Sequence, residues 1–187
     1  MALISGKTLF GSFLFSVFLF LSQVGMSQEN IFPENDGYIV YTNQIISDSI
    51  NQITLWENAL DYLGSLELIN QVKGQEAEID NEGKKAMASQ GFYLLKKGVV
   101  TKQIEGVIES TTTIRIIPGG YAYSINNILY QPYARNRYGK YAPKSSKKYS
   151  LESIYKKKSS KEWIQHFDDI NRKIEEIIYN LESKMSK

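Results

Sequence analysis

An expected β-hairpin in the second half of the chain constrains the fold more than any other stretch of sequence. The run STTTIRII, from Ser110 to Ile117, consists mostly of β-branched residues and favours a strand over Val107–Ile117. Pro118-Gly119-Gly120 is typical of a tight turn, and an aromatic strand is expected over Tyr121–Tyr130. Apolar side chains alternate along this second strand, so we expect one face of the hairpin to be buried. The alternating residues are Tyr121, Tyr123, Ile125 and Leu129.

Two amphipathic helices are predicted to pack on that face. The longer one begins at a capping box, Ser159-Ser160-Lys161-Glu162, in which a hydroxyl precedes an acid by three residues. The shorter one begins at Ser49-Ile50-Asn51-Gln52 and is expected to end at Gly64. Apolar residues then recur at steps of three and four, as they do on one face of a helix. They are Trp163, Phe167, Ile170, Ile174, Ile177 and Leu181 in the longer helix, and Ile53, Trp56, Leu60 and Leu63 in the shorter one.

The remaining strands complete a mixed domain. One strand, rich in β-branched and aromatic residues, is expected over Gly37–Thr42, and another over Ala86–Leu95. Glu67–Val72 fits either the end of the first helix or a short strand. The predicted order is β-α-β-β-β-β-α, which indicates an α+β fold with two helices packed on one face of an antiparallel sheet.

Residues 1–27 are predicted to be a secretory signal peptide. Lys7 gives a weakly positive start, the apolar run Leu9–Leu21 follows, and Gly25-Met26-Ser27 suits cleavage before Gln28. The run is shorter than the roughly 20 apolar residues of a stable membrane span. We therefore expect an exported protein, periplasmic or extracellular, with no transmembrane span after cleavage.

The mature chain is predicted to comprise a flexible leader over 28–36 and a single α+β domain over 37–187. It contains no cysteine, which excludes disulfide scaffolds, thiolate catalysis and cysteine-ligated zinc. Its only histidine, His166, is followed by Asp168 and Asp169, but one histidine and one carboxylate are too few ligands for a metal site. We therefore interpret His166 as a solvent-exposed residue of the last helix, and we expect no metal and no cofactor.

No catalytic constellation is evident in the sequence. Nucleophilic hydrolysis needs a nucleophile, a base and an orienting group, and neither a Gly-x-Ser-x-Gly nor a Gly-x-x-x-x-Gly-Lys motif is present. Adjacent acids such as Glu175-Glu176 point about 100° apart around a helix and do not converge. The chain is therefore predicted not to be an enzyme. The alternative is a hydrolase whose acids are brought together only by folding.

A basic, tyrosine-rich loop is expected over 131–160. The stretch from Gln131 to Lys161 has ten basic residues and one acid, whereas the rest of the mature chain has 11 basic and 19 acidic residues. We call 131–161 the basic segment; its cations are candidate contacts for a polyanion or an anionic membrane surface. The open alternatives are a solvated connector and a loop that lies on the protein's own acidic face. The candidate contacts are Arg135, Arg137, Lys140, Lys144, Lys147, Lys148, Lys156, Lys157 and Lys158.

The last third of the sequence resembles a known family. It combines a hydrophobic strand with a glycine turn, IRIIPGG from Ile114, an aromatic strand, YAYSINNI from Tyr121, and a helix that begins near Trp163. With the signal peptide and the first strand and helix, this pattern resembles exported Bacteroidota domains of unknown function that have a TATA-binding-protein-like fold. The resemblance covers most of 37–185. It implies a curved antiparallel sheet with two helices on one face, and no catalytic residues; the fold name does not imply DNA binding.

These observations predict an exported, non-catalytic binding or interaction domain of the bacterial cell envelope with an unknown ligand. The expected partner is an envelope protein or an anionic envelope component. Nucleic acid is not expected as a partner, because export separates the chain from intracellular nucleic acid. Association with a polyanion or a membrane surface through the basic segment is the alternative prediction.

Overall fold

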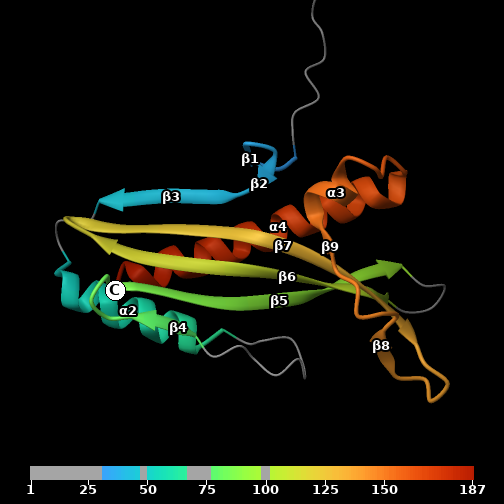
Figure 1. Cartoon of the computed structure of the whole chain (residues 1–187), viewed down its shortest axis with the longest axis horizontal. Helices are drawn as coiled ribbons and strands as arrows, with labels where there is room; N and C mark the ends of the chain where they lie inside the picture. The colour runs from blue at the N-terminus through green and yellow to red at the C-terminus, as the bar shows by residue number, and fades with distance from the viewer. Residues whose placement is uncertain (1–30, 47–49, 67–76, 98–101) are drawn as a thin grey trace, which may run out of the picture. The chain divides into compact units, whose positions relative to one another are not determined.

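An antiparallel sheet forms the centre of the fold in the computed structural model (Figure 1). The structure describes residues 31–46, 50–66, 77–97 and 102–187; the predicted signal peptide and the ambiguous stretch Glu67–Val72 lie outside these ranges. The neighbouring strands of this sheet pair antiparallel, as the sequence predicts. In spatial order they are β3 (Tyr41–Ile46), β7 (Gly120–Arg135), β6 (Lys102–Ile117), β5 (Lys85–Lys97) and β4 (Glu78–Asp80).

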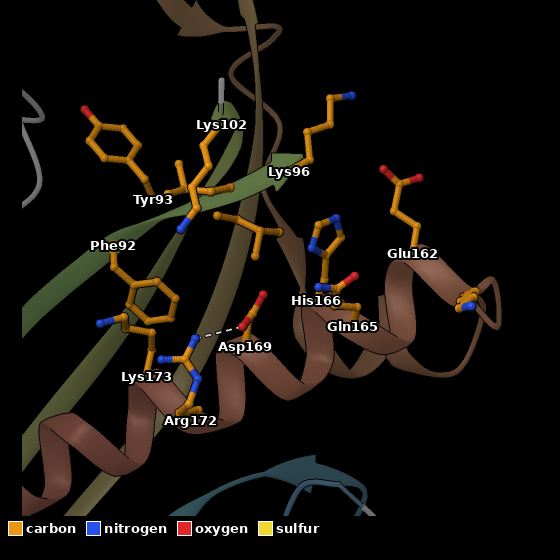
Figure 2. Close-up of a pocket in the computed structure, with 13 residues that line it drawn as sticks. Phe92, Tyr93, Lys96, Lys102, Glu162, Gln165, His166, Asp169, Arg172 and Lys173 are labelled. Carbon is orange, nitrogen blue, oxygen red and sulfur yellow. Dashed lines mark hydrogen bonds and ion pairs between the residues drawn. The ribbon is translucent and has the colours of Figure 1, made fainter. Parts of the chain in front are cut away.

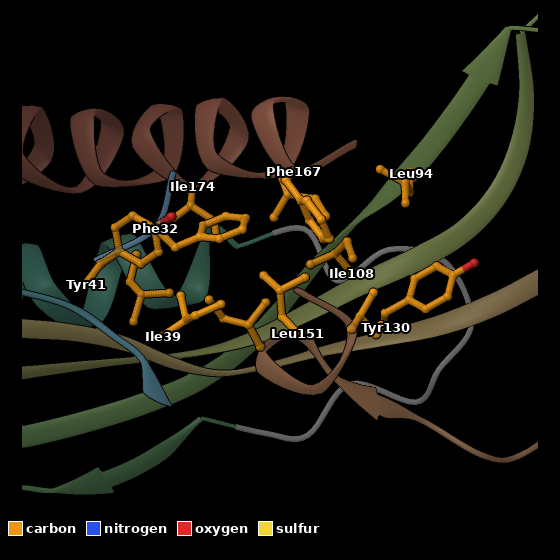
Figure 3. Packing of buried hydrophobic residues seen from close by; sticks show 13 residues of the cluster. Phe32, Ile39, Tyr41, Leu94, Ile108, Tyr130, Leu151, Phe167 and Ile174 are labelled. Carbon is orange, nitrogen blue, oxygen red and sulfur yellow. The ribbon is translucent and has the colours of Figure 1, made fainter. Parts of the chain in front are cut away.

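Two long helices, α2 (Gln52–Gly64) and α4 (Lys161–Met185), bury apolar residues against the sheet. One core cluster joins the first half of α4, through Phe167, to Ile108 of β6 and to the N-terminal strands (Figure 3). A second cluster joins α2 to the far half of α4 through residues such as Leu55 and Leu181. The predicted α+β fold class is therefore confirmed.

The α2 helix begins later than the sequence pattern predicts. It also turns a different set of side chains towards the sheet. Its N-cap is Asn51, whose side-chain oxygen accepts a hydrogen bond from the amide of Thr54 at 2.8 Å; the predicted cap, Ser49, lies outside the described residues. The prediction of Ile53 as a core residue is wrong, because its side chain is 67% exposed. The sheet-facing residues of α2 are Leu55, Ala59, Tyr62 and Leu63, with Trp56 and Leu60 partly buried beside them.

The α4 helix matches its predicted pattern closely. Ser160, one residue after the predicted Ser159, caps it by accepting from the amide of Trp163. Along the predicted face, four residues are buried and the other two, Trp163 and Ile177, are partly buried against the core. The buried four are Phe167, Ile170, Ile174 and Leu181.

The predicted alternation along β7 fails at its middle. Tyr121, Tyr123 and Ile125 are buried as predicted, but beyond Asn127 the buried parity changes, so that Ile128 is buried and Leu129 is only partly buried. Asn127 has a φ of 50°, and the pairing of β6 with β7 shifts register opposite it. A bulge adds one residue to a strand, and one extra residue moves every later side chain to the other face.

The residues predicted as a flexible leader are ordered from position 31 onward, which corrects that prediction. Short strands β1 (Glu34–Asn35) and β2 (Tyr38–Ile39) pair with each other. Phe32 is 1% exposed, and its ring packs edge-on against Tyr155 and Phe167, with centroids 5.2 and 5.9 Å apart. Phe32, with Ile31 packed beside it, therefore belongs to the core, and the predicted strand Gly37–Thr42 is divided between β2 and β3.

The prediction of a loop over 131–160 is wrong for much of the basic segment. Its first residues belong to β7, and β8 (Tyr141–Pro143) and β9 (Tyr149–Ser150) both pair with that strand. A short helix, α3 (Leu151–Tyr155), follows and buries Leu151 and Ile154 in the first core cluster. These two apolar residues, spaced one helical turn apart, fix the segment to the body.

Buried tyrosines tie the sheet and α2 to α4. The hydroxyl of Tyr41 donates to the side-chain oxygen of Asn171 at 2.6 Å, and that of Tyr123 donates to Glu182 at 2.9 Å. Burial, with a nearby carboxylate for most of them, raises the pKa of these phenols above its ordinary value. The pKa rises to about 12 for Tyr62, Tyr121 and Tyr130.

Replacing Phe32 with alanine is expected to destabilise the fold by about 3 kcal/mol or more, because the change leaves a cavity between Tyr155 and Phe167. Urea unfolding of residues 28–187 measures this loss. Tyr38→Ala is the matched control, because Tyr38 is 66% exposed and its removal should change the free energy of unfolding by about 0.5 kcal/mol or less. Equal stability of the two variants would contradict the assignment of Phe32 to the core.

Stability is expected to fall as the pH rises from 10 towards 12. Unfolded tyrosines lose their protons near pH 10, whereas the buried ones hold them until about pH 12, so the folded state binds more protons in this window. Urea midpoints measured across this range test the trend. Tyr62→Phe should reduce the alkaline loss, and a midpoint that is constant up to pH 12 would contradict the burial of these phenols.

Candidate functional site

A cavity of about 710 Å³ opens between the first turns of α4 and the adjoining ends of β5 and β6 (Figure 2). Its size lies within the range of small-molecule sites. Two aromatic residues of β5, Phe92 and Tyr93, contribute to one wall, and polar residues of α4 form the other. The cavity thus lies between residues of β5 and residues of α4, and no sequence motif predicted that these would be neighbours.

His166 is buried at this cavity, which corrects the interpretation of an exposed residue. Its side chain is 3% exposed, and its Nε2 lies 2.8 Å from a carboxylate oxygen of Glu105. Asp169, the acid that helix spacing places nearest to His166 in the sequence, forms an ion pair with Arg172 at 2.7 Å instead. Glu105 is 61 residues away in the sequence, so helix spacing around His166 could not reveal it.

A bulge in β6 turns Glu105 towards α4. Leu94 pairs with Gly106 and Leu95 pairs with Ile104, so Glu105 has no partner residue on β5. Gly106 is required beside it, because a Cβ there would come within 2.2 Å of the ring of Tyr130. Bulges commonly redirect one side chain in this way, and here the redirected side chain is the carboxylate that meets His166.

A third ligand-type side chain completes the group. Donor atoms of Glu105, Glu162 and His166 all lie within 4.8 Å of one another. Glu162 and His166 are four residues apart on α4 and therefore share a face of the helix; Figure 2 shows both rising from α4 on the cavity side. The other ring nitrogen of His166, Nδ1, is buried and has no hydrogen-bond partner among the described residues.

Cations surround this group. Lys96 and Lys102 reach the cavity from β5 and β6, and Lys161 reaches it from the first residue of α4. None of these three lysines forms an ion pair within the described part of the chain. The described lining contains no serine or threonine, and Tyr93 is the one described lining residue with a hydroxyl group.

The predicted polyanion contacts lie elsewhere, on and after the β7–β8 hairpin. At its tip, Tyr138 is 70% exposed and the guanidinium of Arg137 lies 4.8 Å from its ring centroid. Arg135 stacks similarly over Tyr141 at 5.2 Å. Lys140 is exposed at the same tip, where its backbone amide donates to the side chain of Asn136.

The remaining candidate cations fall into three groups: two lie over aromatic rings, one forms an ion pair, and three are exposed. Lys147 lies over Tyr149 at 5.0 Å, and Lys158 lies over Trp163 at 5.9 Å. Of the nine candidates, only Lys148 forms an ion pair within the described residues, with Glu109. Lys144, Lys156 and Lys157 are exposed.

Truncating Glu105 to alanine is expected to destabilise the apo protein by about 1–3 kcal/mol, because the buried imidazole of His166 loses its hydrogen-bond partner. Urea unfolding measures the change. Glu57→Ala on the exposed face of α2 is the matched control and should have an effect of about 0.5 kcal/mol or less. If both variants unfold at the same urea concentration, the interaction between Glu105 and His166 does not stabilise the fold.

Comparison with known proteins supports the fold. No family model and no curated protein matches this chain. A TBP-like protein from Parabacteroides distasonis has a similar structure, with a TM-score of 0.61 and 13% identity over 84% of this chain and 98% of that one. A DUF4468 family protein from Bacteroides ovatus is similar with a TM-score of 0.59 and 11% identity, over 82% of this chain and 91% of that one.

Within the described residues, no helix combines the length and the apolar composition that a membrane crossing requires. The similarity to the two solved structures is a similarity of fold. The chain therefore has the TATA-binding-protein-like fold that the sequence resemblance predicted.

Proposed function

We propose that this chain is an exported, non-catalytic binding domain of the bacterial cell envelope that docks on phosphate-bearing lipids through its basic segment. Export rests on the signal-peptide pattern of residues 1–27. The observation that carries the docking proposal is that the cations of the basic segment are mostly not paired with acids of the described residues. They are carried by strands, a short helix and their connections, and within the described residues almost all of them lack a carboxylate partner.

The contrast with α4 makes this point. On α4, Arg172 bridges Asp169 and Glu176, and Lys173 also pairs with Glu176, so these cations are neutralised by the helix itself. In the basic segment only Lys148 has such a pair among the described residues. A loop that covers the acidic face of its own protein would form many such pairs. The unpaired cations therefore favour an external anion.

The hairpin tip has the chemistry of an interfacial anchor. Tyr138 exposes a ring with a polar hydroxyl, and amphipathic rings of this kind favour the boundary between lipid and water. Arg135, Arg137 and Lys140 surround it, and each cation near an anionic surface contributes about 1 kcal/mol. Gly139, with a φ of 74°, permits the tight turn that places the ring at the tip.

An enzymatic role is the alternative, and it is not favoured. The acids that folding brings together are Glu105 and Glu162, beside His166. Glu162 is exposed, and the described lining of the adjoining cavity lacks a serine or threonine nucleophile. A binding role would use these two acids and His166 and would need no nucleophile.

Vesicle co-sedimentation of residues 28–187 tests the docking proposal. We expect binding to vesicles that contain phosphatidylglycerol, weaker binding at physiological than at low salt, and no binding to phosphatidylcholine alone. The variant R135Q/R137Q/K140Q should bind about 100-fold more weakly, because three cations each contribute about 1 kcal/mol. Lipopolysaccharide aggregates in a parallel series distinguish the source of the lipid phosphate.

A charge-matched variant provides the control. K85Q/R115Q/K187Q removes three cations from other parts of the protein and should retain most of the binding. Equal losses in the two triple variants would reduce the effect to net charge and contradict a specific docking segment. Failure to bind any anionic lipid would contradict lipid docking and direct attention to an envelope protein as the partner.

A further inference from the structure

We propose that Glu105, Glu162 and His166 form a binding site for Zn²⁺ at the edge of the cavity beside α4, where Glu162 and His166 belong to the cavity lining. The three ligands lie outside the basic segment, and the proposal does not depend on the proposed docking function. It joins a bulged residue of β6 to the first two turns of α4. Two carboxylates and an imidazole are nitrogen and oxygen ligands of the kind that zinc accepts.

The burial of His166 beside Glu105 is difficult to explain by stability alone. Both side chains lie next to the aromatic core, where Trp163 packs edge-on against the imidazole at 5.5 Å between ring centroids. Burying a charged or polar pair is often no better for stability than burying two apolar residues of the same size. In addition, Nδ1 of His166 is buried and has no hydrogen-bond partner in the described part of the chain, which carries a further desolvation penalty.

The separations fit a metal site before the metal is bound. Zinc lies about 2.0–2.2 Å from nitrogen and oxygen ligands, so neighbouring donors in a tetrahedral site are roughly 3.3 Å apart. Nε2 of His166 and a carboxylate oxygen of Glu105 are 2.8 Å apart. One donor atom from each of the three residues, Glu162 included, lies within 4.8 Å of the other two. Glu162 is exposed and in the first turn of α4, so its side chain is free to rotate and close the remaining distance.

The electrostatic surroundings indicate how the site would be used. Two carboxylates balance the charge of a divalent ion, and three protein ligands leave a fourth position open, as in zinc sites that bind a further ligand. That position adjoins the 710 Å³ cavity. Lys96, Lys102 and Lys161 line the same cavity; they weaken the attraction for a bare cation and favour an anion as the fourth ligand.

The composition of the chain makes the proposal unusually easy to test. The sequence contains no cysteine and a single histidine, so a zinc site with an imidazole or thiolate ligand must use His166. Calorimetric titration of untagged residues 28–187 with zinc chloride should show one ion bound per chain. The ¹⁵N resonances of the one imidazole should shift on zinc addition and identify the coordinating nitrogen.

Variants assign the ligands. H166Q should abolish saturable zinc binding, and E162Q and E105Q should each weaken it at least about tenfold. D169N is the matched control, because Asp169 lines the same cavity but is paired with Arg172, and its zinc affinity should stay within about twofold of the wild type. Zinc should also raise the thermal midpoint of the wild type but not that of E162Q.

Three results would overturn the proposal: no saturable binding of one zinc ion, zinc binding that persists in folded H166Q, or imidazole resonances that zinc does not shift. If H166Q fails to fold, E162Q decides, because Glu162 is exposed and not required for the core. Unchanged zinc affinity in E162Q would then exclude the three-ligand site.

Discussion

The packing of α4 along the sheet is the constraint on which the rest of the structure depends. Its buried residues enter both core clusters, from Phe167 near its start to Met185 at its end. The N-terminal strands, α3 and α2 are each fixed by contacts to it, through Phe32, Tyr155 and Tyr62. A helix that lies along the sheet must also cover the places where the strands are irregular. The cavity and the buried histidine lie at such a place.

Two bulges determine which side chains meet α4. One lies where β7 changes its buried parity near Asn127, and the other is at Glu105 in β6. The first keeps Tyr130 on the helix side, so that its ring can pack edge-on against Trp163 at 5.4 Å. The second places a carboxylate beneath His166. The apolar and polar parts of this region thus have the same origin, an extra residue in a long strand.

This origin explains how much could be predicted from the sequence. The fold class, the central hairpin and the face of α4 follow from periodic apolar patterns, and the structure confirms them. Bulges break a period without a local sequence signal, so the parity change in β7 and the contact between Glu105 and His166 could not be predicted. Phe32 was missed for a related reason, because its burial depends on partners distant in sequence rather than on its polar neighbours.

The surface of α4 and the surface of the basic segment differ in how their cations are paired, a difference that the composition does not show. Helical spacing of three and four brings Arg172 and Lys173 of α4 next to acids, so the charge of these two cations is largely cancelled. A hairpin has no such spacing, and the cations of the basic segment remain open to solvent or to a partner. Trp163 links the two surfaces, since it contacts Lys158 on one side and His166 on another. Fluorescence of Trp163, observed in a variant without the second tryptophan, Trp56, would therefore report on both regions.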